Sequence, residues 1–174
     1  DDISEFVDTS HEWIFERTGI RQRHIASKDQ MTSDLAYMSA LDAIQDANIN
    51  AADIDLIILA TSTPDQIFPS TAVKLQDMLN IRGGAAFDIH AVCSGFIYAL
   101  STADNFIKSG KYKRILVVGS EVYSRILNWK DRATCVLFGD ASGAFVLEGQ
   151  NNDDIRSGVI DSVVRSDGQY RSKL

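Results

Sequence analysis

The sequence has few cysteines and histidines: its 174 residues include two cysteines, Cys93 and Cys135, and three histidines. The two cysteines are far apart and lack metal-ligand spacing, which argues against a disulfide framework and against a zinc site. We therefore predict no metal site. A reducing compartment suits free thiols, and the cytoplasm is the simplest such location.

The sequence also lacks long apolar runs and an excess of positive charge. No run approaches the roughly 20 apolar residues of a membrane span, and the first four residues do not resemble a secretory signal. The chain has 17 Lys and Arg residues and 24 Asp and Glu residues, which gives a net charge of −7. This balance argues against nucleic-acid binding, and any acidic partner would have to meet a local basic patch.

The residues that are present suit one folded domain. Hydrophobic residues make up 45% of the chain and charged residues 24%, a composition typical of a globular core and not of a disordered segment. The chain begins in an acidic stretch without an initiator methionine and ends in a turn-like run over residues 166–174. We therefore expect it to be part of a longer chain.

Apolar periodicity predicts an α/β domain in which strands and helices alternate. Helices are predicted over residues 10–17, 32–47, 70–79 and 94–109, and buried strands over residues 53–60, 85–89 and 114–119. Residues 135–148 are predicted to form a strand with a tight glycine turn at its entry, and residues 155–165 a last strand. Short connections imply right-handed crossovers and a largely parallel sheet covered on both faces.

Several helix ends can be predicted from single residues. Thr9 or Ser10 is a candidate N-cap of the first helix, and Gly19 is expected to end that helix. Thr32 or Ser33 is expected to cap the second helix. Pro69 suits the first position of the third helix.

Cys93 lies at the junction between the strand 85–89 and the helix 94–109. A thiol on the first turn of a helix meets free N–H groups and the positive end of the helix dipole, which favour the reactive thiolate. Functional residues also tend to lie beyond the carboxyl ends of parallel strands. The alternative is a buried structural cysteine, and position alone leaves both interpretations open.

Linked motifs along nearly the whole chain resemble one family. They are Ala91–Phe96, Thr9–Ile14 with Arg17–Arg23, Ala60–Asp65 with Phe68–Ser70, Val117–Glu121, and Asp131–Arg132 through Phe138–Asp140. Together they resemble the first half of β-ketoacyl-[acyl-carrier-protein] synthase III, of the thiolase-like superfamily. The resemblance implies that residues 1–174 form an N-terminal thiolase-like domain, α/β with a mostly parallel five-stranded mixed sheet covered by helices on both faces.

The resemblance also implies an activity, a condensing acyltransferase that starts type II fatty-acid synthesis. The Cys93 thiolate would take an acyl group from acetyl-CoA or another short acyl-CoA, with the Cys93 amide as an oxyanion donor. Malonyl-acyl-carrier protein would then lose carbon dioxide and yield acetoacetyl-carrier protein. Such enzymes form homodimers and need no cofactor. Their catalytic His and Asn belong to a second half that this chain does not contain.

Four further residues are implied to bind coenzyme A. Trp13 and Arg132 would sandwich the adenine, Arg17 would bind the pyrophosphate region, and Thr9 would form a hydrogen bond with the base. Taken without the resemblance, Trp13 is equally well a core residue. The arginines would be ordinary surface charges.

Two phenylalanines are implied to shape the acyl pocket. Phe68 would reach across the dimer to floor the partner's pocket, and Phe138 would line the pocket of its own chain. Both could instead be core residues. His90, although near Cys93 in sequence, is predicted to be a packing or surface residue. Cys135 is predicted to be a buried strand residue.

The glycine run 139–143 lacks a phosphate-loop pattern and precedes a strand, so a phosphate-loop role is rejected. Two alternatives to the synthase remain open. One is another thiolase-like enzyme: a thiolase, a hydroxymethylglutaryl-CoA synthase or a polyketide-type synthase. The other is a non-catalytic folded fragment. In either case the isolated chain is expected to be inactive in condensation.

Overall fold

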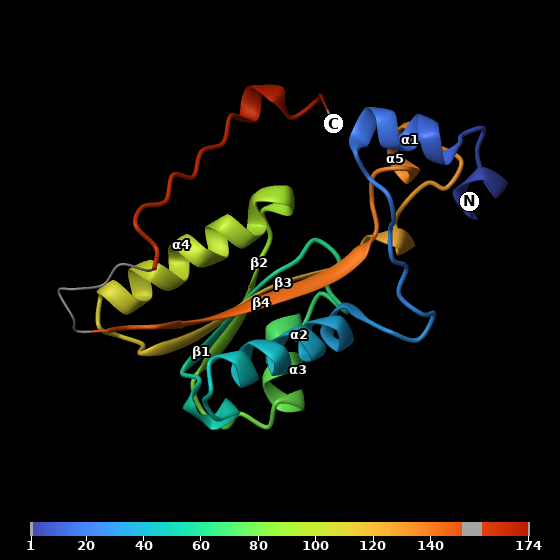
Figure 1. Cartoon of the computed structure of the whole chain (residues 1–174). Coiled ribbons are helices and arrows are strands. Elements are labelled where there is room, and N and C mark those ends of the chain that lie inside the picture. Colours follow the sequence, from blue (N-terminus) through green and yellow to red (C-terminus); the bar gives the residue numbers. More distant parts are fainter. Residues whose placement is uncertain (1, 151–157, 174) are drawn as a thin grey trace.

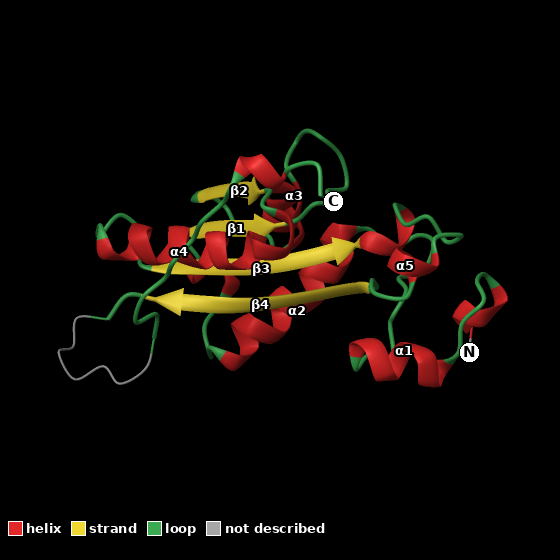
Figure 2. Cartoon of the chain, turned by 90° about the horizontal axis from the view of Figure 1, so that it is seen from above, coloured by secondary structure: helices red, strands yellow, loops and turns green. Residues whose placement is uncertain are grey.

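A mixed sheet forms the centre of the structure, a computed structural model that describes residues 2–150 and 158–173. In the described part the sheet has four strands in the order β2-β1-β3-β4. The first three strands of this order are parallel, and β4 is antiparallel to β3 (Figure 2). The strands are β1 (Leu56–Ala60), β2 (Ala85–Ile89), β3 (Arg114–Val122) and β4 (Asp140–Glu148).

Helices cover both faces of this sheet, as predicted. Helix α4 (Gly95–Lys108) lies on one face, and α2 (Thr32–Asp46) and α3 (Thr71–Met78) lie on the other (Figure 1). Successive side chains of a strand point to opposite faces, so Ile58 packs in the core with α4 while Leu59 packs in the core with α2 and α3. Strand β1 is buried on both faces, which explains its unbroken apolar sequence.

Two short helices lie beyond the carboxyl end of the parallel strands: α1 (His11–Thr18) and α5 (Arg132–Cys135) (Figures 1 and 2). A third, small hydrophobic core, formed by Ile14, Cys135 and Val136, packs α1 against α5. The remaining turns of 3-10 helix are η1 (Asp2–Glu5), η2 (Ala51–Asp53), η3 (Val92–Ser94), η4 (Tyr123–Arg125) and η5 (Gly168–Tyr170). Among the described helices, none has the length and apolar character needed to cross a membrane.

The predicted ends of α1 are confirmed. Ser10 is the N-cap, and its Oγ accepts a hydrogen bond from the Trp13 N–H at 3.2 Å. Gly19 follows the helix in a left-handed conformation, with φ of 71°, which glycine adopts at low cost.

The predicted N-caps of α2 and the predicted first residue of α3 are wrong. Met31 is the N-cap of α2, and its N–H donates to Asp34 Oδ2 at 2.7 Å. Helix α3 begins after the N-cap Ser70, so Pro69 precedes the cap and is not the first helical residue. The hydroxyls of Thr32 and Ser33 do not cap α2 because both form hydrogen bonds with the loop after β1.

The expected fifth strand is absent from the described residues. Residues 158–165 form no strand, and residues 155–157 of that prediction lie outside the described part. The predicted strand over residues 135–138 is also wrong, since Cys135 ends α5. The predicted glycine turn is wrong as well. Residues 140–143 belong to β4, which pairs with β3 as far as Val122 and Asp140.

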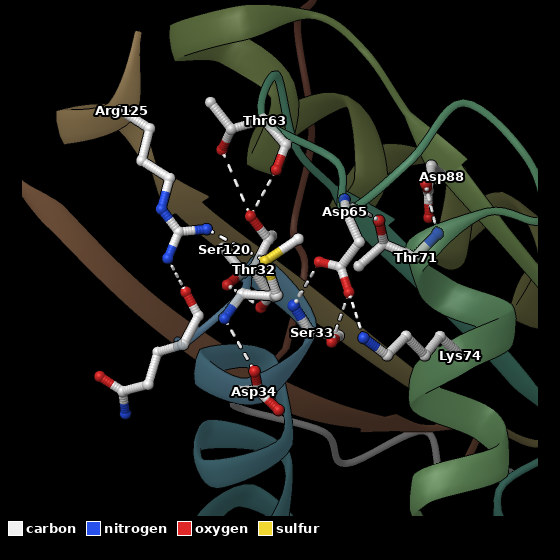
Figure 3. A network of polar contacts seen from close by, with 12 residues as sticks. Thr32, Ser33, Asp34, Thr63, Asp65, Thr71, Lys74, Asp88, Ser120 and Arg125 are labelled. Atoms are coloured by element: carbon white, nitrogen blue, oxygen red, sulfur yellow. Dashed lines mark hydrogen bonds and ion pairs between the residues drawn. The ribbon is translucent and has the colours of Figure 1, made fainter. Parts of the chain in front are cut away.

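Asp65 connects the start of α2 to α3 (Figure 3). Its carboxylate accepts hydrogen bonds from Ser33 N at 2.9 Å and from Ser33 Oγ at 2.6 Å, and Lys74 Nζ lies 2.6 Å from it. Burial opposes ionisation, but the contacts with Lys74 and Ser33 outweigh it and hold the pKa of Asp65 below its ordinary value. The ionised carboxylate therefore stabilises the fold.

We expect Asp65→Asn to lower the free energy of unfolding by about 1–3 kcal/mol at neutral pH, because an amide cannot accept all of these hydrogen bonds. Since the folded-state pKa is depressed, the stabilisation is complete above the unfolded pKa of about 3.9 and is lost as pH falls through the folded value. The difference between variant and wild type, measured by urea unfolding, should therefore shrink in acid. Asp77→Asn is the control, since Asp77 pairs with Arg82 on the surface. An equal loss in both variants would contradict the role given to Asp65.

Candidate active site

Cys93 occupies the turn between β2 and α4. Strand β2 ends at Ile89, and the chain passes through η3, of which Cys93 is the middle residue, directly into α4. Val92, the residue before it, has φ of 49°. A β-branched residue rarely adopts this left-handed conformation, and such strain is concentrated at functional sites. The thiol is exposed, in contrast to a structural cysteine.

A cavity of about 260 Å³ lies beside Cys93. Its wall includes Ser62 from the loop after β1, Glu121 from the end of β3, Tyr123 from η4, and Phe138. The rings of Tyr123 and Phe138 are stacked, with centroids 4.6 Å apart. The cavity therefore lies at the carboxyl ends of the parallel strands, where ligands of such sheets bind.

A second cavity, of about 460 Å³, lies between the N-terminal segment and the loops near α5. Its wall includes Thr9, Ile14, Arg23 and Trp129, and it shares Phe138 with the cysteine cavity. Phe138 is half-buried. The two cavities are thus neighbours with one common wall.

Trp13 brings together three of the residues predicted to bind coenzyme A. The Arg132 guanidinium carbon lies 3.9 Å from the centre of the Trp13 ring, and that of Arg17 lies 4.4 Å from it. Two cations in contact with one indole form cation–π pairs. In a chain of net charge −7, this cluster is a local basic patch of the kind that an anionic ligand requires.

Four buried polar side-chain atoms have no hydrogen-bond partner among the described residues: Thr9 Oγ1, Arg23 Nε, Ser62 Oγ and Arg132 Nε. Thr9 and Arg23 line the larger cavity, Ser62 lines the cysteine cavity, and Arg132 contacts Trp13. Buried polar groups in proteins are nearly always paired. Their concentration here supports a ligand site. Sequence reasoning assigned no role to Ser62, Glu121 or Arg23, although all three lie within the motifs that carry the family resemblance.

The other predicted positions vary in their surroundings. Phe68 is 82% exposed and lines neither cavity of its own chain, so its role in a pocket stays a prediction. His90, predicted to be a packing or a surface residue, is exposed. Cys135 is fully buried as predicted, but in a helix. Within residues 2–150 and 158–173, no group of three or more His, Cys, Asp or Glu side chains could hold a metal ion.

Comparisons with known proteins agree with this geometry. A family model described as 3-oxoacyl-[acyl-carrier-protein] synthase III matches residues 87–168, which include Cys93. A β-ketoacyl-[acyl-carrier-protein] synthase III of Bradyrhizobium diazoefficiens is 56% identical over 171 residues, covering 97% of this chain and 52% of the relative. The chain belongs to this synthase III family and corresponds to the N-terminal half of the relatives it matches.

Further synthase III proteins are similar over the same extent. A synthase III from Ehrlichia ruminantium is 56% identical over 174 residues, a match that covers all of this chain and 54% of the relative. The crystal structure of 3-oxoacyl-[acyl-carrier-protein] synthase III from Aquifex aeolicus has a TM-score of 0.84 at 52% identity, covering 87% of this chain and 49% of its own. The chain therefore spans about half the length of the synthase III relatives it matches.

We expect iodoacetamide at neutral pH to label Cys93 and to leave Cys135 unmodified. Burial and the nearby Asp131 carboxylate raise the pKa of the Cys135 thiol, and its side chain has no exposed surface, whereas Cys93 is exposed. Peptide mass spectrometry reads the label at each position, and urea should make Cys135 reactive. Similar labelling of both cysteines in the folded chain would contradict this assignment.

Proposed function

We propose that this half supplies the acyl-accepting cysteine and the coenzyme A site of a condensing acyltransferase that starts type II fatty-acid synthesis. The observation that carries the proposal is the placement of Cys93: an exposed thiol after a strained residue, beside a cavity, within the segment matched by the synthase III family. In this proposal residues 1–174 are an N-terminal thiolase-like domain. A cytoplasmic location stays a prediction.

The proposed reaction has two stages. The Cys93 thiolate attacks the carbonyl carbon of acetyl-CoA or another short acyl-CoA; a carbon–sulfur bond to Cys93 forms and the CoA thiolate leaves. Malonyl-acyl-carrier protein then loses carbon dioxide, and its carbanion attacks the acyl group to give acetoacetyl-carrier protein and the free thiol. By resemblance, a His and an Asn of the second half support the second stage.

The basic cluster around Trp13 supports coenzyme A as the donor. An adenine ring needs a flat stacking surface and phosphates need guanidinium groups, and Trp13, Arg17 and Arg132 supply both within one contact cluster. Thr9, with an unpaired buried hydroxyl, suits the proposed hydrogen bond to the base. Because Arg132 contacts the Trp13 ring directly, it must move away before a base can enter between them.

The proposal also includes a homodimer. Ile67 and Phe68 are 92% and 82% exposed, and large apolar side chains at this exposure favour contact with another surface. Phe68 would then floor the partner's acyl pocket, as the resemblance implies. Phe138, which lines the cysteine cavity, would contact the acyl group within its own chain.

Acetyl-CoA should add one acetyl group to the chain, because Cys93 is an accessible thiol beside the cavity. Intact mass before and after incubation measures the gain, and peptide mapping locates it. We expect Cys93→Ser to abolish the gain and Cys135→Ser to keep it. An acetyl group retained in the Cys93 variant would refute the assignment of the nucleophile.

The same sample tests whether the half is sufficient for condensation. After acetylation, malonyl-acyl-carrier protein should yield no acetoacetyl product, because the groups proposed to support the second stage are not in this chain. Product formed by a chain of verified mass 19.2 kDa would show that residues 1–174 suffice.

Arg132→Ala should weaken coenzyme A binding roughly fivefold to tenfold, through loss of the stacking and phosphate-directed cation. Isothermal calorimetry with coenzyme A measures the change in Kd. Arg82→Ala is the matched control, since it removes the same charge from a surface arginine that pairs with Asp77 and lines neither cavity. Equal losses in the two variants would mean that only overall charge matters.

A further inference from the structure

Ser62 lines the cavity beside Cys93, and its hydroxyl has no partner among the described residues. The Oγ atom is itself buried. A buried hydroxyl without a partner costs free energy. Such a group in a cavity next to a nucleophile is available to a ligand.

Glu121 fixes the backbone that carries this hydroxyl. Its Oε1 accepts the Ser62 N–H at 2.7 Å, and its Oε2 accepts the hydroxyls of Thr61 at 3.4 Å and Thr63 at 2.5 Å. One carboxylate at the end of β3 therefore orders three successive residues of the loop after β1.

Thr63 connects the same loop to two more elements. Its Oγ1 accepts the Val122 N–H at 2.9 Å, and its carbonyl accepts the Thr32 hydroxyl from the start of α2 (Figure 3). Ser120 in turn donates to the Thr32 carbonyl at 2.9 Å. The main chain of Ser62 is thus held on both sides, while its own hydroxyl has no partner in the described part of the chain.

An acetyl group on Cys93 is the ligand that complements this hydroxyl. It has one hydrogen-bonding atom, the carbonyl oxygen, and this atom only accepts. Among the other cavity groups, Phe138 is an apolar ring and the Glu121 carboxylate is already engaged as an acceptor. The Cys93 amide is the oxyanion donor that the resemblance implies, and Tyr123 carries a second hydroxyl. A carbonyl oxygen can accept a second hydrogen bond beside that of the amide, and Ser62 is the candidate donor because its hydroxyl has no partner among the described residues.

We propose that the Ser62 hydroxyl donates a hydrogen bond to the carbonyl oxygen of the acyl group as it is transferred to Cys93, and that Glu121 is the positioning residue for this donor. The inference rests on the proposed role of Cys93 as acyl acceptor. During transfer the thiolate bonds to the carbonyl carbon, the bond to the leaving group breaks, and negative charge develops on the carbonyl oxygen. A fixed donor lowers the barrier by stabilising that charge; Ser62 itself gains or loses no proton.

Two reagents separate this role from a general effect on the thiol. p-Nitrophenyl acetate acetylates Cys93 with release of p-nitrophenolate, and methyl methanethiolsulfonate modifies the same thiolate without any carbonyl group. Rates for the 174-residue chain are measured by intact mass with peptide mapping, and Cys93→Ser gives the background. The variants are Ser62→Ala, Glu121→Gln, the double variant, and Ser62→Thr, which keeps a hydroxyl. Ser109→Ala, at the far end of α4, is the control.

We expect Ser62→Ala to slow acetylation about tenfold, the effect of one charge-assisted hydrogen bond, and to leave the thiolsulfonate rate unchanged. Ser62→Thr should restore acetylation. Glu121→Gln should slow acetylation as well, yet the double variant should be no slower than Ser62→Ala, since both changes act through one hydroxyl. A merely structural role would instead slow both reagents.

Three results would overturn the proposal: unchanged acetylation in Ser62→Ala, equal slowing with both reagents, or additive losses in the double variant. If Glu121→Gln does not fold, the comparison of Ser62→Ala with Ser62→Thr decides alone. p-Nitrophenyl acetate carries no coenzyme A, so the role of Ser62 can be tested even if the chain does not react with acetyl-CoA. Failure with acetyl-CoA would contradict the proposed function and leave the test of Ser62 intact. A wild-type chain acetylated no faster than Cys93→Ser would remove the basis of both.

Discussion

The loops above the carboxyl ends of the strands depend on carboxylates that accept hydrogen bonds from backbone N–H groups. Buried N–H groups need a partner, and irregular loops cannot supply one to themselves. Asp140, 6% exposed, accepts from Ala26 N and Ser124 N at 2.7 Å each. The acceptors in this set are Asp65, Asp88, Glu121 and Asp140. These carboxylates therefore fix loop residues such as Ser62 and Ala26 and also the first turns of α2 and α3.

Because some carboxylates have this structural role, the net negative charge of the chain does not describe the charge at its candidate site. Part of the negative charge lies inside the structure, where Asp65, Glu121 and Asp140 hold loops together. The candidate coenzyme A site carries the opposite charge, from Arg17 and Arg132 against Trp13. Net charge therefore argued against a nucleic-acid surface at the sequence level, but it could not predict the sign of the local field at the site.

Elements with strong apolar patterns could be predicted from sequence, and elements decided by tertiary pairing could not. The burial of β1 and the helical stripe of α4 follow from local periodicity. Residues 139–143, rich in small side chains, suggest a turn, but pairing with β3 makes residues 140–143 part of a strand. The place of Cys93 between a strand and a helix was predictable, whereas its exposure was not, because position alone left a buried structural cysteine open. The strain at Val92 and the pairing of Ser62 with Glu121, 59 residues apart, have no local signal.

Phe138 belongs to two cavities at once. The volume of its side chain therefore affects both cavities. A smaller side chain enlarges the space beside Cys93 and the space beside Thr9 together, and a larger one reduces both. Neither cavity can be resized at this position independently of the other. The stacking partner Tyr123 further restricts which ring shapes fit. A change confined to the space beside Cys93 therefore has to be made at residues that line that cavity alone.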